Sequence, residues 1–174
     1  MIEKMKKFIS GQISVNYRIN AGIIPKNVWI QDRTIGGGRI IGEVCHFIDT
    51  CSYLIGSEVK SVFATTINKE DKSIPDEDNV NIVLNYANGS IATISYYAYG
   101  DNSMPKEYIE VFSSGLSMQM NDFRELVIFK GGKVVKEKSS NQDKGFVNEF
   151  IAFKESVKSG NSAISFESIY NTTM

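Results

Sequence analysis

An Asn-Gly pair between two alternating segments places the strongest constraint on how this chain folds. Residues 79–86 and 90–97 each alternate apolar with polar side chains, which is typical of strands with one buried face. Asn88-Gly89 lies between them, and this dipeptide favours a tight hairpin turn because both of its residues accept a positive φ. The segment therefore predicts two antiparallel neighbours in a sheet.

Further short segments extend this predicted sheet. Strands are expected over residues 13–20, 59–68, 108–113, 116–121, 126–130 and 133–138. Helices are expected over residues 1–9, from Glu43 to a stop at Gly56, over 146–158, and from about Phe166 onward. About seven strands joined mainly by hairpins, with three or four helices, predict an α+β fold with an open, mostly antiparallel β-sheet and helices packed on one face.

Two connections between these elements are long. Residues 22–38 form a loop that contains the sole tryptophan, Trp29, and a loop of this length in a compact domain is often functional. Residues 69–78 form a polar connection whose acidic side chains include Asp71, Asp76, Glu77 and Asp78. They lack the spacing of an EF-hand, so a solvated loop is the better interpretation than a cation site.

Composition points to one globular domain over residues 1–174 and excludes several classes of function. The net charge is −1, which gives no electrostatic case for binding nucleic acid or an anionic membrane. No apolar run is long enough to span a membrane, and residues 1–7 lack the apolar core of a signal peptide. One histidine and two cysteines without ligand spacing argue against a metal site. The expected location is the cytoplasm.

The only histidine, His46, follows a run of three glycines and lies three residues after Glu43. At helical spacing these two side chains are surface neighbours, and a carboxylate can hold an imidazole in one tautomer. That is a suitable arrangement for proton transfer. The alternative is an ordinary solvated pair in which Glu43 complements the helix dipole from the first turn.

Residues 36–49, GGGRIIGEVCHFID, resemble the signature that opens the main helix of the C-terminal domain in the glucose-fructose oxidoreductase / inositol dehydrogenase / rhizopine-catabolism (Gfo/Idh/MocA) family. Upstream, residues 17–22 and Trp29-Ile30 are similar to the strand and loop before those glycines. Downstream, residues 145–150 and 159–161 resemble the closing helix and its turn. The resemblance covers nearly the whole chain.

The resemblance implies a two-domain enzyme of which this chain is the second part. Family members bind NAD or NADP on an N-terminal Rossmann domain, which also carries the lysine that shares the acid/base role. A dinucleotide fingerprint requires G-x-G-x-x-G, and the third glycine after Gly36 and Gly38 would fall on Ile41. The N-terminal NAD(P)-binding domain is therefore not expected in this chain, and the cofactor would be bound mainly by that missing domain.

The resemblance also implies a set of site residues. His46 corresponds to the histidine that assists proton transfer at the reacting hydroxyl, and Glu43 is the candidate carboxylate beside it. Relatives of the inositol dehydrogenase type carry an aspartate four residues before that histidine, where this chain has Gly42. Either Glu43 replaces that aspartate from a different angle or this branch has lost it.

Four further residues are expected to contact substrate or support the histidine: Asn20, Trp29, Arg39 and Asp49. Arg39 is suited to hold a carboxylate or phosphate by its planar fork, or else lies on the surface. Trp29 either lines the cleft or fills the core beneath its loop. Asp49, one turn after His46, is expected to orient the imidazole rather than to react.

The predicted function is that of the substrate-binding domain of an NAD(P)-dependent oxidoreductase acting on a sugar, a sugar derivative or a similar hydroxyl/carbonyl compound. The expected partners are a small-molecule substrate, the missing Rossmann domain, and further copies of the chain in a homodimer or homotetramer. Contact through the free sheet face is expected near Ser95, Tyr97 and Tyr99. The alternatives are a stand-alone, non-catalytic ligand-binding or assembly domain, and a cofactor-free lyase or epimerase.

Overall fold

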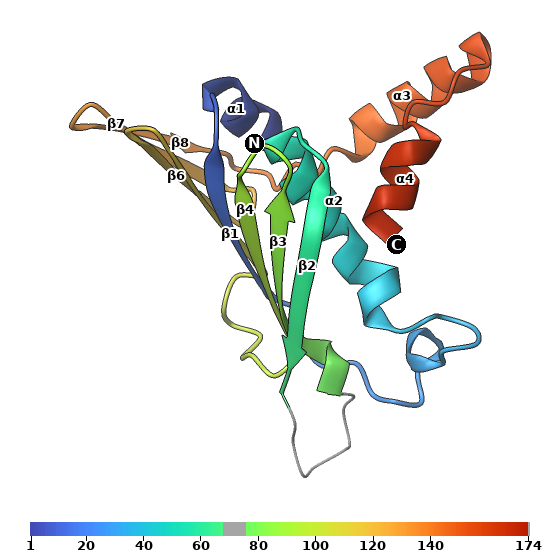
Figure 1. The fold of residues 1–174 in the computed structure, drawn as a ribbon. Helices are drawn as coiled ribbons and strands as arrows, with labels where there is room; N and C mark the ends of the chain where they lie inside the picture. Colours follow the sequence, from blue (N-terminus) through green and yellow to red (C-terminus); the bar gives the residue numbers. More distant parts are fainter. Residues whose placement is uncertain (68–75, 174) are drawn as a thin grey trace.

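A computed structural model describes residues 1–67 and 76–173 of the chain. Its main feature is an eight-stranded sheet in the order β2-β3-β4-β1-β5-β6-β7-β8 (Figure 1). The strands are β1 (Ile13–Asn20), β2 (Val59–Thr66), β3 (Asn79–Tyr86), β4 (Ile91–Tyr97), β5 (Glu107–Ser113), β6 (Leu116–Asn121), β7 (Glu125–Lys130) and β8 (Lys133–Lys138).

Hairpins account for most of the pairing. The expected turn at Asn88-Gly89 joins β3 to β4, and β5 to β8 form a continuous antiparallel meander. Among the described strands, only β1 and β4 pair in parallel, where the first strand is inserted between the two halves of the sheet. The predicted α+β fold with an open, mostly antiparallel sheet is confirmed.

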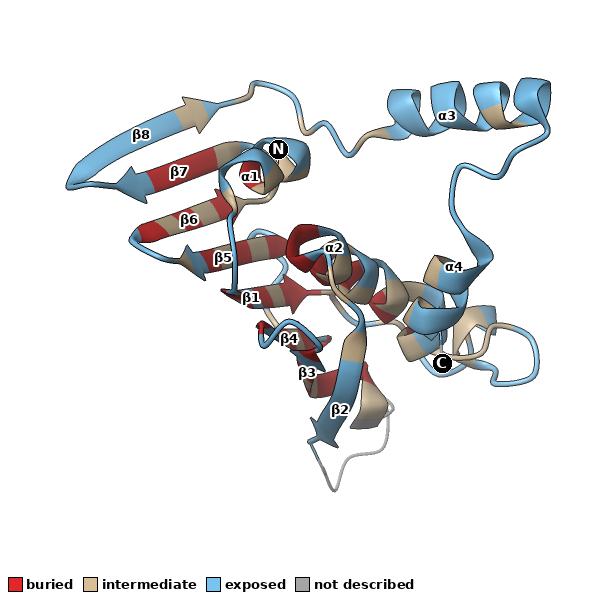
Figure 2. Ribbon diagram, turned by 45° about the horizontal axis from the view of Figure 1, so that its top comes forward, coloured by how far each residue is buried: buried red, intermediate tan, exposed pale blue. Residues whose placement is uncertain are grey.

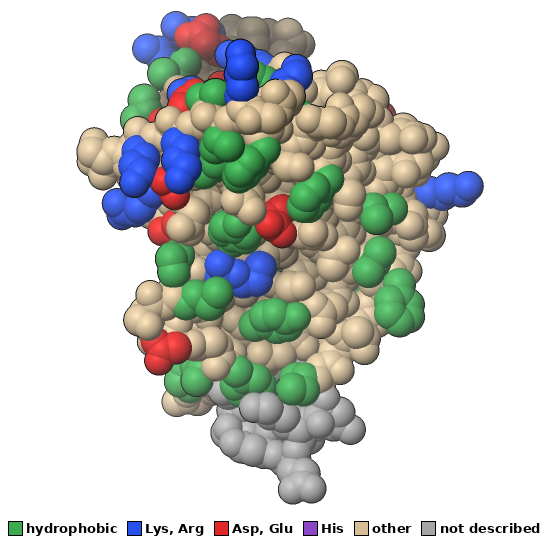
Figure 3. All heavy atoms as spheres, turned by 90° about the vertical axis from the view of Figure 1, so that its left-hand side faces the viewer, with side chains coloured by type: hydrophobic (Ala, Val, Ile, Leu, Met, Phe, Trp, Pro, Cys, Tyr) green, Lys and Arg blue, Asp and Glu red, His purple; other side chains and the backbone are tan. Residues whose placement is uncertain are grey.

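One face of the sheet is buried and the other is open. The buried core consists of alternate side chains of the central strands together with one side of α2 (Cys45–Ile55), and α1 (Ile2–Phe8) closes one end through Met5. The opposite face carries the other set of alternate residues, including Ser95 and Tyr97 as expected. Figure 3 shows hydrophobic side chains distributed across this open face.

The central helix buries one apolar stripe of residues at helical spacing. Val44, Cys51 and Ile55 are buried in the core, and Ile48 packs against it. Phe47 contributes two ring contacts, with its centroid 5.2 Å from that of Tyr17 and 6.0 Å from that of Tyr96. Gly56 ends the helix in the left-handed conformation, with φ 70°, which glycine adopts without a steric cost.

The last two helices lie apart from the core. These are α3 (Phe146–Ser159) and α4 (Phe166–Thr173), and neither contains a buried residue. Figure 2 shows α3 exposed along most of its length, whereas α2 is buried against the sheet. Short helical turns complete the structure: η1 (Trp29–Gln31), η2 (Ile40–Val44) and η3 (Asp76–Asp78).

The polar connection expected over residues 69–78 lies largely outside the described residues. Its described end forms η3, and there Asp78 is completely buried rather than solvated. Among the described residues, no group of acidic, histidine and cysteine side chains is arranged to hold a metal ion, and no helix is long and apolar enough to cross a membrane.

Candidate active site at the start of α2

The entry to α2 is built on a close approach between two loop segments. A Cβ on Gly36 would lie 2.4 Å from the Cα of Ile30, so only glycine fits there. The glycine run therefore packs against residues 29–30 and does not form the strand-to-helix cradle that holds a dinucleotide. The residues present do not fit a cofactor phosphate, and we assign no cofactor contact to them.

Gly42 has a related packing role. A Cβ at this position would lie 2.8 Å from the Cδ1 atom of Ile30. An aspartate there, as in relatives of the inositol dehydrogenase type, would have to displace that side chain. The departure from the family pattern at Gly42 thus coincides with a tight contact between η2 and the loop before it.

The helix begins with a π turn over Ile40–Val44 before it continues as α2. A π turn contains more residues than the 3.6 of an α-helix, and such turns occur frequently at functional sites. The angular relation between Glu43 and His46 therefore differs from the one that regular helical spacing predicts. The two residues meet through the backbone carbonyl of Glu43, which lies 3.0 Å from the Nδ1 atom of His46.

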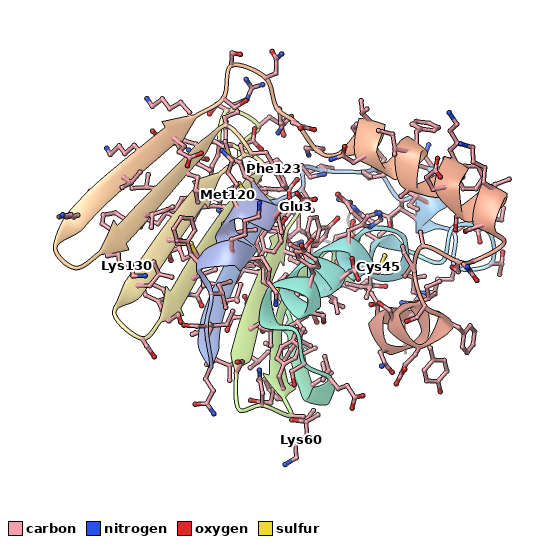
Figure 4. All side chains as sticks on the ribbon, turned by 90° about the horizontal axis from the view of Figure 1, so that it is seen from above. Glu3, Cys45, Lys60, Met120, Phe123 and Lys130 are labelled. Carbon is pink, nitrogen blue, oxygen red and sulfur yellow. The ribbon has the colours of Figure 1, made fainter. Side chains whose placement is uncertain are left out.

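His46 is exposed, and its ring is anchored at one nitrogen. Because a carbonyl oxygen only accepts hydrogen bonds, the contact with Glu43 favours the tautomer that carries its proton on Nδ1. The Cys45 thiol lies 3.4 Å from the same nitrogen. Nε2 is then the basic nitrogen of the neutral ring and the one available to a ligand. Figure 4 labels Cys45, the neighbour of His46 in the chain, on α2.

The Glu43 carboxylate takes part in a separate network. It accepts hydrogen bonds from Arg39 at 2.9 Å, from the Tyr96 hydroxyl at 2.6 Å and from Lys106 at 2.7 Å. Burial raises the pKa of Glu43, but the hydrogen bonds from Lys106, Tyr96 and Arg39 outweigh burial and lower it to about 2. Glu43 therefore stays ionised near neutral pH and is a weak base.

Arg39 is the centre of this network and is only 1% exposed. Its guanidinium donates to Glu43, to the backbone oxygens of Ala21 and Gly22 at 3.2 and 2.6 Å, and lies 3.8 Å from Asp78. It also lies 5.1 Å from the centroid of the Tyr96 ring. These partners occupy the fork that a substrate carboxylate or phosphate would need, so the geometry favours a positioning role.

Asp78 is the second carboxylate beside Arg39. Its environment raises its pKa, whereas the environment of Glu43 lowers the pKa of that residue. Burial raises the pKa of Asp78, and this effect exceeds the lowering by the Gln31 side chain, 2.7 Å away, and by Arg39. One of its two oxygens is buried without a hydrogen-bond partner. A single arginine thus supports two carboxyl groups whose surroundings differ.

The other predicted site residues are spread around this network. Asn20 is buried, donates to the backbone oxygens of Asp101 and Met104 at 2.7 and 3.2 Å, and so fixes the loop after β4. It also lines a cavity of about 430 Å³ that Lys106 borders. Trp29 is 64% exposed in η1, so it does not fill the core. Asp49 is exposed and lines a groove between α2 and α4.

Sequence reasoning did not identify Asp78, Tyr96 or Lys106. Lys106 lies 63 residues after Glu43 along the chain, and no local spacing relates them. Tyr96 lies next to Tyr97, which is expected on the free sheet face, but the Tyr96 side chain points to the helix-covered face. The only local signal for Asp78 was the acidic run that contains it.

Residues 9–115 match the GFO/IDH/MocA C-terminal domain. The chain belongs to this family. No curated protein sequence matches the chain.

Solved structures share the fold of almost the whole chain. A dehydrogenase from Clostridium difficile matches 99% of it with a TM-score of 0.77 at 19% identity, over 55% of that protein's chain. The aldose-aldose oxidoreductase of Caulobacter crescentus, complexed with glycerol, gives 0.74 at 19% identity, with coverage of 99% and 56%. Levoglucosan dehydrogenase in complex with NADH gives 0.73 at 18% identity, with coverage of 99% and 56%. The chain thus spans little more than half the length of these proteins.

Proposed function

We propose that this Gfo/Idh/MocA domain is the substrate-binding part of an NAD(P)-dependent oxidoreductase that acts on a sugar, a sugar derivative or a similar hydroxyl/carbonyl compound. The observation that carries the proposal is the geometry of His46, whose ring is anchored through Nδ1 while Nε2 is left basic on an exposed helix face. Family membership supplies the reaction class, and the names of two similar structures refer to aldose and levoglucosan.

In this proposal the chain's own residues carry the proton and position the substrate. His46 Nε2 accepts the proton of the reacting hydroxyl when the substrate is oxidised, and returns it to the carbonyl oxygen in the reverse direction. A nicotinamide held by a separate domain supplies the hydride chemistry. NAD and NADP are equally compatible with this chain, because the residues that would distinguish them belong to that domain.

Glu43 and Arg39 act as positioning residues in the same proposal. The ionised Glu43 fixes the π turn to Arg39, Tyr96 and Lys106, and its carbonyl orients the His46 ring. Asn20 shapes the adjacent cavity by holding the loop after β4, and the exposed Trp29 and Asp49 are the remaining candidates for contact with substrate.

The test is a comparison of two variants in the natural protein, assayed with NAD and with NADP against a panel of sugars. His46→Ala is expected to lower kcat by about 10²- to 10⁴-fold, the usual contribution of a general acid–base group. Asp49→Asn, on the same exposed helix face, tests a candidate for substrate contact and is expected to raise KM more than it lowers kcat. Full activity in His46→Ala would contradict the proposed role of the histidine.

The open sheet face supports a second, structural proposal, that two or four copies of the chain associate through it. By the register of the strands, aromatic and aliphatic side chains that are at least 36% exposed lie on this face, among them Phe63, Ile91, Phe112, Phe129 and Val134. Phe112→Glu is expected to convert the oligomer to a monomer in sedimentation experiments. An unchanged sedimentation coefficient would contradict an interface at this face.

A further inference from the structure

The turn between β6 and β7 has an unusual backbone for its residue types. Among the described residues, only Asp122 and Phe123 combine a side chain with a positive φ, 49° and 56° respectively. Aspartate tolerates this left-handed conformation, whereas a bulky residue such as phenylalanine rarely adopts it. Residues in such conformations persist where the surrounding structure fixes them, and they occur frequently at ligand sites. The turn therefore calls for a functional explanation.

Contacts on both sides hold this turn in place. The Phe123 ring packs against the core, and its backbone N–H lies 2.9 Å from the Met120 sulfur (Figure 4). The Asp122 backbone donates to the Glu107 carbonyl at 2.8 Å and accepts from the Gln142 side chain at 3.1 Å. These contacts use the backbone of Asp122 and leave its carboxylate for another purpose.

One oxygen of the Asp122 carboxylate has no hydrogen-bond partner among the described residues. This oxygen, Oδ1, is buried. The other, Oδ2, lies 3.9 Å from the Nε atom of Arg124, which is beyond hydrogen-bond distance. A carboxylate oxygen only accepts hydrogen bonds, and leaving a buried acceptor unpaired costs free energy. A ligand that donates a hydrogen bond to Oδ1 would remove this cost.

Asp122 borders the cavity of about 430 Å³ that Asn20 also lines. This volume is within the range of small-molecule sites, about 300–1,000 Å³. The charged side chains of the lining are balanced, two positive and two negative: Lys106, Arg124, Asp122 and Glu125. A balanced lining gives no net attraction for an ion, but it offers both donors and acceptors. Hydroxyl groups, which donate and accept, match such a lining.

The loop between β4 and β5 forms another wall of the cavity, and side chains of β1 fix this loop. Asn20 donates to the backbone oxygens of Asp101 and Met104 at 2.7 and 3.2 Å. Arg18 donates to the backbone oxygen of Pro105 at 2.7 Å. The cavity is thus formed before a ligand arrives, which lowers the entropic cost of binding.

The cavity adjoins the network around Glu43. Lys106 borders the cavity and donates to the Glu43 carboxylate at 2.7 Å, which uses one of its three N–H donors. Ala21 and Gly22 line the cavity as well, and Arg39 donates to their backbone oxygens. A single side chain, that of Lys106, therefore joins the cavity to the residue whose carbonyl orients the candidate histidine.

We infer that this cavity is the subsite for an uncharged, polyhydroxylated part of the substrate, a sugar ring, and that Asp122 determines its specificity by accepting a hydrogen bond from a hydroxyl group. The inference rests on the proposed function. A sugar acid or a sugar phosphate is a poorer occupant, because its charge would meet the Asp122 carboxylate. The β6–β7 turn lies outside residues 9–115, which match the family model, so family membership assigns no role to Asp122.

The first experiment measures the binding of neutral and acidic sugars to the natural protein by saturation-transfer NMR, without nicotinamide. The neutral probes are glucose, galactose and myo-inositol, and the acidic probe is gluconate. At least one neutral probe is expected to bind at least about fivefold more tightly than gluconate, whose charge is repelled by Asp122. Equal or tighter binding of gluconate, or no binding of any neutral probe, would overturn the inference.

The second experiment removes the Asp122 side chain. Asp122→Gly keeps the turn, because glycine adopts a positive φ without steric cost. The Kd of the bound neutral probe is expected to rise at least about tenfold, since a hydrogen bond to a charged group is lost. Unchanged binding would overturn the inference, because the carboxylate would then serve only the turn.

Two further variants control this experiment. Asp122→Asn suits the same backbone and keeps one side-chain oxygen, so it should weaken binding by a smaller factor, about threefold. Glu137→Gln in β8, where the side chain is 39% exposed, removes one negative charge outside the cavity and should leave Kd within about twofold. An equal loss of affinity in Glu137→Gln would overturn the inference, because net charge and not the Asp122 contact would then control binding.

Turnover separates the subsite from the proposed function. Asp122→Gly is expected to raise KM at least about tenfold while kcat falls less than about threefold, whereas His46→Ala lowers kcat. If His46→Ala is fully active while neutral sugars still bind through Asp122, the proposed function is wrong and the cavity stands as a sugar site. If His46→Ala is inactive while Asp122→Gly has normal KM and normal sugar binding, the subsite is wrong and the proposed function stands.

Discussion

The helices α2 and α3 have similar amphipathic sequences but opposite environments. In α2, Phe47, Cys51, Leu54 and Ile55 are buried against the sheet, whereas every apolar side chain of α3 is exposed. Both helices end at a glycine in the left-handed conformation. The comparison shows that helical periodicity identifies which side chains seek burial but does not identify the surface that buries them.

The largest expected effect concerns the network of Arg39, Glu43 and Asp78 at the start of α2. The helix α3 contains no buried residue and so has no comparable buried network. Arg39→Ala removes the arginine that Glu43 and the buried Asp78 share, so we expect it to destabilise the fold by about 3–5 kcal/mol. Urea denaturation of the 174-residue chain measures this difference. Lys158→Ala, at the exposed end of α3, is the control and should be close to neutral.

The apolar side of α2 should be nearly as sensitive. Leu54 is completely buried, and Leu54→Ala is expected to cost about 2–5 kcal/mol through the lost contacts and the cavity that remains. Val157→Ala in α3 removes a side chain that is 67% exposed and should change the unfolding free energy by less than about 0.5 kcal/mol. Equal costs at the two positions would mean that α3 is packed in solution.

The loss of stability at acid pH should also come from the start of α2, through Glu43. Because the folded pKa of Glu43, about 2, lies below its ordinary value of 4.5, its contribution is complete above about pH 5 and is lost as the pH falls toward 2. We expect about 2 kcal/mol, since the partly exposed side chain reduces the full effect of the shift.

The measurement is the unfolding free energy from pH 7 to pH 2.5 for the natural sequence and for Glu43→Gln. Asp78 has a raised pKa, acts with the opposite sign and is present in both proteins, so the difference between them reports mainly on Glu43. That difference should shrink as the pH falls. A constant difference across the pH range would contradict the ionised network.

The smallest expected effect on stability is at the exposed apolar side chains of α3. Phe150→Glu should leave the unfolding free energy of the 174-residue chain within about 0.5 kcal/mol, because the side chain is 73% exposed. The same substitution should increase solubility, measured by light scattering at high concentration, since it interrupts an apolar patch. A large loss of stability would place Phe150 in a core that the comparison of the two helices excludes.

The sheet could be predicted in detail because its signals are local. The turn at Asn88-Gly89 and the period-2 alternation of β3 and β4 specify a hairpin without any distant contact. The apolar stripe of α2 and its stop at Gly56 are equally local. The parallel pairing of β1 with β4 is different, because it joins strands more than 70 residues apart and depends on the closure of the whole sheet.

The candidate site could be predicted from the sequence only in part. His46 and Glu43 stand out as an isolated histidine and a nearby carboxylate in a motif that resembles a known family. Regular helical spacing, however, predicts a contact between their side chains, and the π turn over Ile40–Val44 replaces it with a contact to the Glu43 carbonyl. No pattern of residue types in the sequence predicts that π turn.

The sequence by itself determined the family, the fold class and the order of the strands along the chain, and it made His46 the candidate for the proposed site. These follow from local periodicity, turn chemistry and a contiguous motif. Only the tertiary structure decided that Arg39 is buried with Glu43, Asp78 and Tyr96, and that α3 has no place in the core. The physical reason is that burial and ionic pairing depend on which distant segments meet, and this is a property of the assembled sheet and helices.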